Sequence, residues 1–141
     1  MRYLLDTCVV SELRAKRPDP EVVSWIDNVD PDNLYLSVVT LGEVQKGIEK
    51  VKDPVMKTAL TSWLRDELLV RFQDHILDLD TRILLQWGTL AGRLETRGTP
   101  MPAIDSLLAA TALDRNLVLV TRNESDFRAS GVQILNPWQL S

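Results

Sequence analysis

The stretch that decides the fold is residues 103–121, which read AIDSLLAATALDRNLVLVT. Residues 103–114 are nearly all apolar and predict a buried helix. Leu117-Val118-Leu119-Val120 follows almost at once, and such a run is typical of a strand that is buried on both faces, inside a parallel sheet. A buried helix that leads directly into a buried strand indicates an α/β fold.

The rest of the chain repeats this alternation of short apolar strands and amphipathic helices. Further strands are expected at 3–5, 34–37, 76–79 and 132–135, the last at a sheet edge. Helices are expected at 11–14, 20–26, 39–50, 53–69 and 80–98, several of them with Asp or Pro start signals. Strands separated by helices predict a mostly parallel central sheet of about five strands flanked by helices. At 141 residues, we expect a single domain over 1–141.

Composition narrows the function classes. The net charge of −4 offers no general basic field for nucleic acid, although Arg14, Lys16 and Arg17 cluster, as do Lys46, Lys50 and Lys52. One cysteine and one histidine exclude a disulfide framework and most zinc sites, so that any metal must be held mainly by oxygen. No membrane-length apolar run and no secretory signal pattern is present, and we expect a cytoplasmic protein with no membrane partner.

Four acids are the candidate functional residues: Asp6, Glu43, Asp105 and Asp126. Asp6 closes the first predicted strand, and Asp126 follows the strand that ends near Thr121. Asp105 lies in the apolar helix, where its neighbours one and two turns on are apolar. In parallel sheets ligands bind outside the carboxyl ends of the strands, so acids distant in sequence can meet there.

Each acid also has a simpler explanation. Asp6 could simply cap a helix, because Asp is a common N-cap residue. Asp126 could be a surface turn residue, since Asp is also common in turns. Asp105 could be a helix N-cap near Pro102, and Glu43 could form a capping box with Thr40. Taken together, however, acids that share one cleft would repel one another, which raises their pKa values or requires a divalent cation.

Carboxylates suit Mg²⁺, or Mn²⁺ as a substitute, and two such ions can activate water for phosphodiester hydrolysis. Thr121 and Asn123 are candidate polar contacts of this site, with helix capping as their alternative. Cys8 has no histidine near it in sequence, and His75 has no neighbour at the spacing of a metal ligand. Both are interpreted as structural. The four tryptophans fit core or dimer packing better than base stacking.

Four blocks of sequence together resemble a known family. They are Leu4-Leu5-Asp6-Thr7, Thr40-Leu41-Gly42-Glu43-Val44, Ile104-Asp105-Ser106-Leu107-Leu108-Ala109-Ala110-Thr111-Ala112, and Val120-Thr121-Arg122-Asn123 with Asp126-Phe127. In order and spacing they resemble PIN-domain ribonuclease toxins of the VapC/FitB type. The resemblance runs from Tyr3 to about Pro137.

The resemblance implies a metal-dependent endoribonuclease in a toxin–antitoxin pair. It assigns Asp6, Glu43 and Asp105 to the acidic metal site, with Asp126 or Asn123 in the fourth position and Thr7 orienting Asp6 or a metal-bound water. It also implies a homodimer, and a cognate antitoxin whose tail occupies the acidic cleft and through which DNA is reached. Cys8 is a departure, because such toxins commonly have Asn at this position.

Candidates for holding the RNA backbone are Arg14, Lys16, Arg17, Lys46, Lys50 and Arg122. Two other functions fit less well. An aspartate-nucleophile phosphatase needs a second Asp where this chain has Cys8, and a phospho-acceptor domain needs a lysine where Thr121-Arg122-Asn123 stands. A catalytically silent module that acts only through its antitoxin in a DNA-bound regulatory complex is the remaining alternative.

Overall fold

The central feature of the computed structural model, which describes residues 1–140, is a five-stranded sheet in the order β3-β2-β1-β4-β5. Every pairing of neighbouring strands is parallel. The strands are β1 (Tyr3–Leu5), β2 (Leu34–Ser37), β3 (Ile76–Leu77), β4 (Val118–Val120) and β5 (Ile134–Leu135). The predicted α/β class, the parallel sheet and the edge position of the last strand are confirmed.

Helices fill the connections. The α-helices are α1 (Thr7–Arg14), α2 (Pro20–Asn28), α3 (Val38–Glu49), α4 (Pro54–Ser62), α5 (Leu69–Arg71), α6 (Thr81–Thr96), α7 (Ala103–Arg115) and α8 (Glu124–Phe127). Shorter 3₁₀ turns are η1 (Pro31–Asn33) and η3 (Arg128–Ser130), and η2 (Trp63–Leu68) is a π-helical segment. No helix within residues 1–140 is both long enough and apolar enough to cross a membrane.

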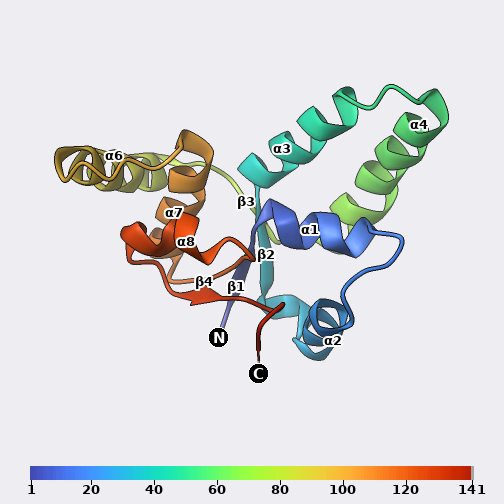
Figure 1. Ribbon diagram of the computed structural model, residues 1–141, viewed down its shortest axis with the longest axis horizontal. Coiled ribbons are helices and arrows are strands. Elements are labelled where there is room, and N and C mark those ends of the chain that lie inside the picture. The colour runs from blue at the N-terminus through green and yellow to red at the C-terminus, as the bar shows by residue number, and fades with distance from the viewer. Residues whose placement is uncertain (141) are drawn as a thin grey trace.

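Two apolar cores lie on opposite faces of the sheet because neighbouring strand residues point to opposite sides. Leu4 is buried against α6, α7 and α8, whereas Leu5 is buried against α1, α2 and α3. In β4, Leu119 belongs to the same core as Leu4, and Val120 belongs to the same core as Leu5. Figure 1 accordingly shows α6, α7 and α8 on one side of the strands and α1 to α4 on the other.

Several predicted boundaries are wrong. The third strand stops at Leu77 rather than 79, because its partner β2 ends at Ser37, opposite Leu77. The last strand begins at Ile134 rather than 132, since the N–H of Val132 donates to the hydroxyl of Ser130 instead of the sheet. The fourth begins at 118, because the N–H of Leu117 still bonds back to α7.

Two predicted helices also differ from the structure. The first begins at Thr7 rather than 11, because Asp6 caps it. The single helix expected over 53–69 is interrupted by the π-helical turns of η2, which the regular spacing of its apolar residues did not reveal. Trp63 is the first residue of this segment.

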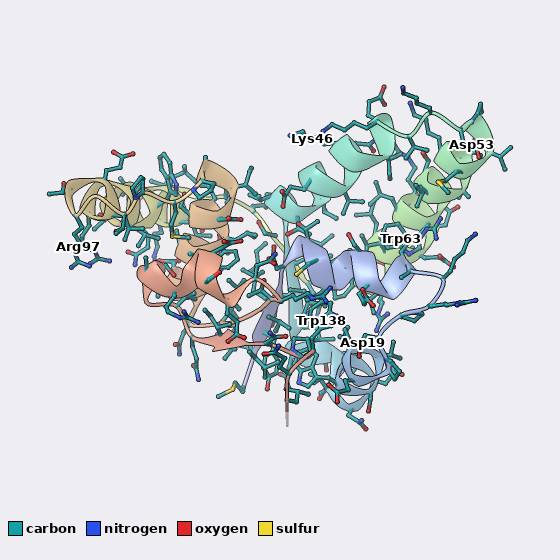
Figure 2. All side chains as sticks on the ribbon, in the orientation of Figure 1. Asp19, Lys46, Asp53, Trp63, Arg97 and Trp138 are labelled. Atoms are coloured by element: carbon teal, nitrogen blue, oxygen red, sulfur yellow. The ribbon has the colours of Figure 1, made fainter. Side chains whose placement is uncertain are left out.

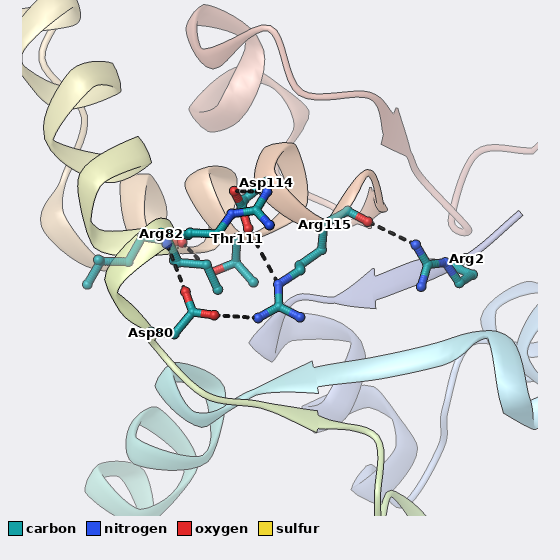
Figure 3. Close-up of polar contacts among 8 residues, drawn as sticks. Arg2, Asp80, Arg82, Thr111, Asp114 and Arg115 are labelled. Carbon is teal, nitrogen blue, oxygen red and sulfur yellow. Dashed lines mark hydrogen bonds and ion pairs between the residues drawn. The ribbon is translucent and has the colours of Figure 1, made fainter.

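An ionic network fixes α7, the helix that carries Asp105, to its surroundings (Figure 3). Arg115 near the end of α7 pairs with Asp80, the N-cap of α6, at 2.6 Å, and Arg82 pairs with Asp114 at 3.3 Å. Arg2 donates to the backbone oxygen of Arg115 at 3.1 Å. The N–H of Ile83, and then Arg115, lower the pKa of Asp80. These contacts link α7 to the start of α6 and to the residue before β1.

Candidate active site

The carboxylate of Asp6 lies where β1 passes into α1. It is the N-cap of α1 and is 6% exposed. Its Oδ1 accepts the backbone N–H of Thr7 at 2.7 Å, and its Oδ2 accepts the hydroxyl of Thr121 at 2.8 Å. The helix-cap role is therefore real but occupies only one oxygen. Burial raises the pKa of Asp6, and these hydrogen bonds partly oppose the rise because they favour the charged form.

The carboxylate of Glu43 is held by the residue that follows Asp6. The hydroxyl of Thr7 donates to Oε1 of Glu43 at 2.6 Å and so joins α1 to α3. The alternative of a capping box with Thr40 is wrong, because the N-cap of α3 is Ser37 and Glu43 lies in the second turn. Thr7 thus orients two acids at once, one through its amide and one through its hydroxyl.

Asp105 lies in the first turn of α7. The alternative that it is the N-cap is wrong, because Pro102 takes that position. Burial, followed by the negative charges of Asp6, Asp126 and Glu43, raises the pKa of Asp105 to about 6. Since such charge effects weaken with distance, the three other acids must lie near Asp105. The N-cap of α1 and the helices α3, α7 and α8 therefore each contribute one acid to a single site.

Asp126 and Asn123 compete for the fourth position. Asp126 lies within α8 rather than in a surface turn, is exposed, and contributes to the raised pKa of Asp105. Asn123 precedes α8 without capping it through its side chain, and its backbone N–H donates to the hydroxyl of Thr121 at 3.0 Å. The charge effect places Asp126 near Asp105 but does not decide between the two residues, because the neutral amide of Asn123 would have no such effect at any distance, and the fourth ligand stays a prediction.

Cys8 is a site residue that the sequence interpretation missed. Its Sγ lies 3.7 Å from Oδ2 of Asp6 and 3.7 Å from Oγ1 of Thr121, and it accepts the backbone N–H of Arg122 at 3.4 Å. Burial raises the pKa of the Cys8 thiol, and the charge of Asp6 adds to the rise. The sequence feature that could have indicated this role is the position of Cys8, two residues after Asp6 and in the first turn of α1.

The structural interpretation of His75 agrees with its surroundings. A ring nitrogen of His75 lies 3.1 Å from the backbone oxygen of Leu34, and the ring packs on Tyr35 with 4.8 Å between the centroids. Both contacts tie the start of β3 to β2. His75 therefore belongs to the sheet and not to the acidic site.

The acidic site fits a hard divalent cation by its chemistry, although no three acidic, histidine or cysteine side chains among residues 1–140 are yet arranged to hold an ion. Its donors are carboxylate and hydroxyl oxygens. None of the ion pairs among the described residues involves Asp6, Glu43, Asp105 or Asp126. These acids therefore repel one another, as the pKa of Asp105 indicates, and a cation such as Mg²⁺ or Mn²⁺ would relieve that repulsion.

Two hollows open beside the acids. One of about 340 Å³ lies between α1, α3 and the end of α4, and Thr7 and Glu43 border it. The other, of about 250 Å³, lies between α8 and the loop before α7, and Asp126 borders it. Beyond Thr121, the guanidinium of Arg122 stacks over the ring of Trp138, 5.4 Å from its centroid. An elongated ligand that crosses the acids therefore has space on either side of them.

The model of the PIN domain family matches residues 3–131 of this chain. Toxin FitB from Neisseria gonorrhoeae is 32% identical over 135 residues, which cover 96% of this chain and 97% of that protein. VapC ribonuclease Y4jK from Sinorhizobium fredii is also 32% identical, over 96% of this chain and 97% of its own. A solved structure of FitAB bound to a DNA fragment (IR36) aligns with a TM-score of 0.91 and 30% identity, over 99% of this chain and 97% of that chain.

Proposed function

Because this chain belongs to the PIN domain family, we propose that it is a magnesium-dependent endoribonuclease that acts as the toxin of a toxin–antitoxin pair. The residues that would hold Mg²⁺ are Asp6, Glu43, Asp105 and Asp126. Mn²⁺ is the expected substitute because it has similar oxygen-ligand preferences. The alternative fourth residue is Asn123, whose amide oxygen is a weaker, uncharged donor.

The observation that carries the proposal is that Thr7 joins the carboxylates of Asp6 and Glu43, while no lysine or arginine pairs with any of the four acids within the described residues. The raised pKa of Asp105 agrees with this, because the other three carboxylates disfavour its charge. A fold does not keep such a cluster for stability, because mutual repulsion and burial both oppose folding. Clusters of this kind are retained where they bind a cation or perform chemistry.

When bound, a divalent ion supplies Lewis acidity and a nucleophilic water for in-line attack on a phosphodiester. The chain's own residues fix the ligands. Thr7 donates hydrogen bonds to both Asp6 and Glu43 and so orients these two carboxylates relative to each other. Thr121 donates to the second oxygen of Asp6. Asp126 is exposed to solvent.

RNA would be held by basic side chains on or next to α1, α3 and β4, the elements that carry the acids or lead to them. Arg14 borders the larger hollow, and Arg122 follows Thr121 at the end of β4. Lys46 and Lys50 are exposed on or just after α3, and Lys16 and Arg17 are exposed after α1. Such cations contact phosphates and position a strand without reading its sequence.

The proposed partners are a cognate antitoxin and a second copy of this chain, in the cytoplasm. The similarity to FitB and to FitAB bound to DNA supports an antitoxin that also brings the toxin to DNA. The net charge of −4 suits a basic antitoxin segment. An arginine of that segment placed among the four acids would replace the cation and leave the nuclease inactive.

The test uses antitoxin-free protein, RNA, and either Mg²⁺ or EDTA. Cleavage should require Mg²⁺ and should fall by at least about 100-fold in Asp6→Asn and Asp105→Asn, because each removes a charged ligand. Asp53→Asn is the matched control, since Asp53 caps α4 at the outer end of that helix (Figure 2) and Asn caps equally well. Cleavage that persists in EDTA, or in both site variants, rejects the proposal.

A further inference from the structure

The larger hollow is continuous with the proposed active site. It has a volume of about 340 Å³, and the hydrogen-bonded pair Thr7 and Glu43, 2.6 Å apart, forms part of its wall. Any group that fills the hollow therefore lies beside Glu43, one of the four acids. The volume lies near the small end of the range of about 300–1,000 Å³ that is usual for ligand sites, so that a single small group fits better than an extended one.

The walls of the hollow suit a flat, partly apolar ring. Val44 and Ile48 of α3 and Leu60 of α4 supply an apolar lining, and Trp63 supplies an indole that is only half-buried. Figure 2 shows Trp63 at the C-terminal end of α4, beside α1. Unpaired RNA bases are commonly recognised by stacking on aromatic side chains. The sequence predicts a packing role for Trp63, which explains the buried part of the indole but not the part that lines the hollow.

A cation without a carboxylate partner borders the same hollow. Arg14 is half-buried near the end of α1, yet it takes part in none of the ion pairs among residues 1–140. Ser11, one turn earlier on α1, adds an exposed hydroxyl. Arginine binds phosphate through two parallel hydrogen bonds, so that a phosphate would supply the missing negative charge.

Resting on the proposed nuclease function, we propose that this hollow is a subsite for one unpaired nucleotide of the RNA strand, adjacent to the phosphate that is cut. The base lies against Trp63 and the apolar lining, and its phosphate binds Arg14. The subsite shares Thr7 and Glu43 with the acidic centre. Base identity is then read one nucleotide from the cleavage point, by the shape of the hollow and by Ser11.

The first test fills the hollow without disturbing the fold. Gly47 lines the hollow, and a Cβ added there meets no atom within 4 Å, so Gly47→Leu is expected to fold. The control is Gly88→Leu on α6, a second exposed helical glycine with open space around it. The concentration of RNA that half-saturates cleavage should rise by about fivefold or more in Gly47→Leu and stay unchanged in Gly88→Leu.

The second test asks whether a base is the occupant. RNA substrates carry one abasic nucleotide, placed in turn on each side of the cleavage position. With intact RNA, Trp63→Leu should raise the half-saturating concentration by about fivefold or more, whereas Trp63→Phe, which keeps an aromatic face, should raise it less. With the abasic nucleotide at the matching position, Trp63→Leu and the native protein should become equal. Trp25→Leu is the control for loss of an indole, because Trp25 lies on α2 and does not line the hollow.

The outcomes separate the two proposals. Native protein that cleaves no RNA rejects the nuclease function and the subsite together. Cleavage that Gly47→Leu leaves unchanged rejects the subsite alone, and does so even if the Trp63 variants fail to fold. If Gly47→Leu weakens antitoxin binding but not RNA cleavage, the hollow receives protein and the nucleotide subsite is rejected. An effect of Trp63→Leu that is equally large on every abasic RNA also rejects it.

Discussion

The hydroxyl of Thr121 donates a 2.8 Å hydrogen bond to Oδ2 of Asp6, although 115 positions separate the two residues in the sequence. Both follow strands that are neighbours in the sheet, since β1 pairs with β4. The bond is buried, with Thr121 fully inaccessible and Asp6 nearly so. It fixes one oxygen of Asp6 and leaves the acid in a defined orientation.

Replacing Thr121 with Val should therefore destabilise the protein. The buried carboxylate of Asp6 would lose a donor that it cannot recover from water, at a cost of about 1–3 kcal/mol in the free energy of unfolding. Urea unfolding of antitoxin-free protein measures this difference. Thr121→Ser keeps the hydroxyl and should lose much less. Equal stability of the Val and Ser variants would show that the bond contributes little.

Replacing Thr7 with Val should weaken divalent-ion binding while leaving every acid in place. Its hydroxyl orients Glu43 at 2.6 Å, and loss of a residue that orients a metal ligand commonly lowers affinity by about 10- to 100-fold. The dissociation constant for Mn²⁺ is the measured quantity. Thr7→Ser, which retains a hydroxyl, should bind nearly normally. Native affinity in Thr7→Val would show that Glu43 needs no such support.

The raised pKa of Asp105 predicts how the stability of ion-free protein depends on pH. Its pKa is about 6 in the folded protein and 3.8 ordinarily, so between these values the folded state binds more protons than the unfolded state. The free energy of unfolding should consequently fall as pH rises from about 4 to about 7. Asp6, whose pKa is also raised, acts in the same direction.

Asp105→Asn provides the check on that dependence. In EDTA at pH 8 it should stabilise the protein by about 1 kcal/mol, with solvent screening taken into account, because it removes a repelled charge. At pH 4 the native Asp105 is already protonated, and the substitution should change stability little. Urea unfolding at both pH values measures the effect. A stabilisation that is the same at both would contradict the assignment.

The thiol of Cys8 should react slowly with iodoacetamide. Burial first, and then the charge of Asp6, raise its pKa, so that little of the reactive thiolate is present at pH 8. The alkylation rate should be lower than that of a cysteine-containing peptide, and Asp6→Asn should increase it. The same rate in native protein and peptide would show that the thiol is free of its neighbours.

Much of the fold could be predicted because the hydrophobic pattern and the alternation of strands and helices along the chain constrain it strongly. The apolar runs at Leu4-Leu5 and Val118–Val120 require burial on both faces, and the helices between strands require parallel pairing. The meeting of Asp6 with the segment after Thr121 followed from the rule that parallel strands place their carboxyl ends together. Strand ends were less predictable, as the bond from Val132 to Ser130 illustrates.

The remaining site features depend on side-chain direction, which sequence spacing does not encode. The bond from Thr7 to Glu43 joins helices whose relative placement is set by the sheet order. The contact of Cys8 with Asp6 carries no motif, because a single cysteine has no characteristic spacing. The π-helical turn at Trp63 likewise leaves the apolar period nearly unchanged, yet it places that indole beside the larger hollow.

The central claim is that the four acids bind a divalent cation, and titration calorimetry with Mn²⁺ tests it most directly. The protein is freed of antitoxin and treated with chelator beforehand. Native protein should show saturable binding, which Asp6→Asn and Asp105→Asn should each weaken by at least about tenfold while Asp53→Asn leaves it unchanged. No saturable binding by the native protein, or equal binding by all four proteins, would contradict the claim and favour a catalytically silent module that acts through its antitoxin.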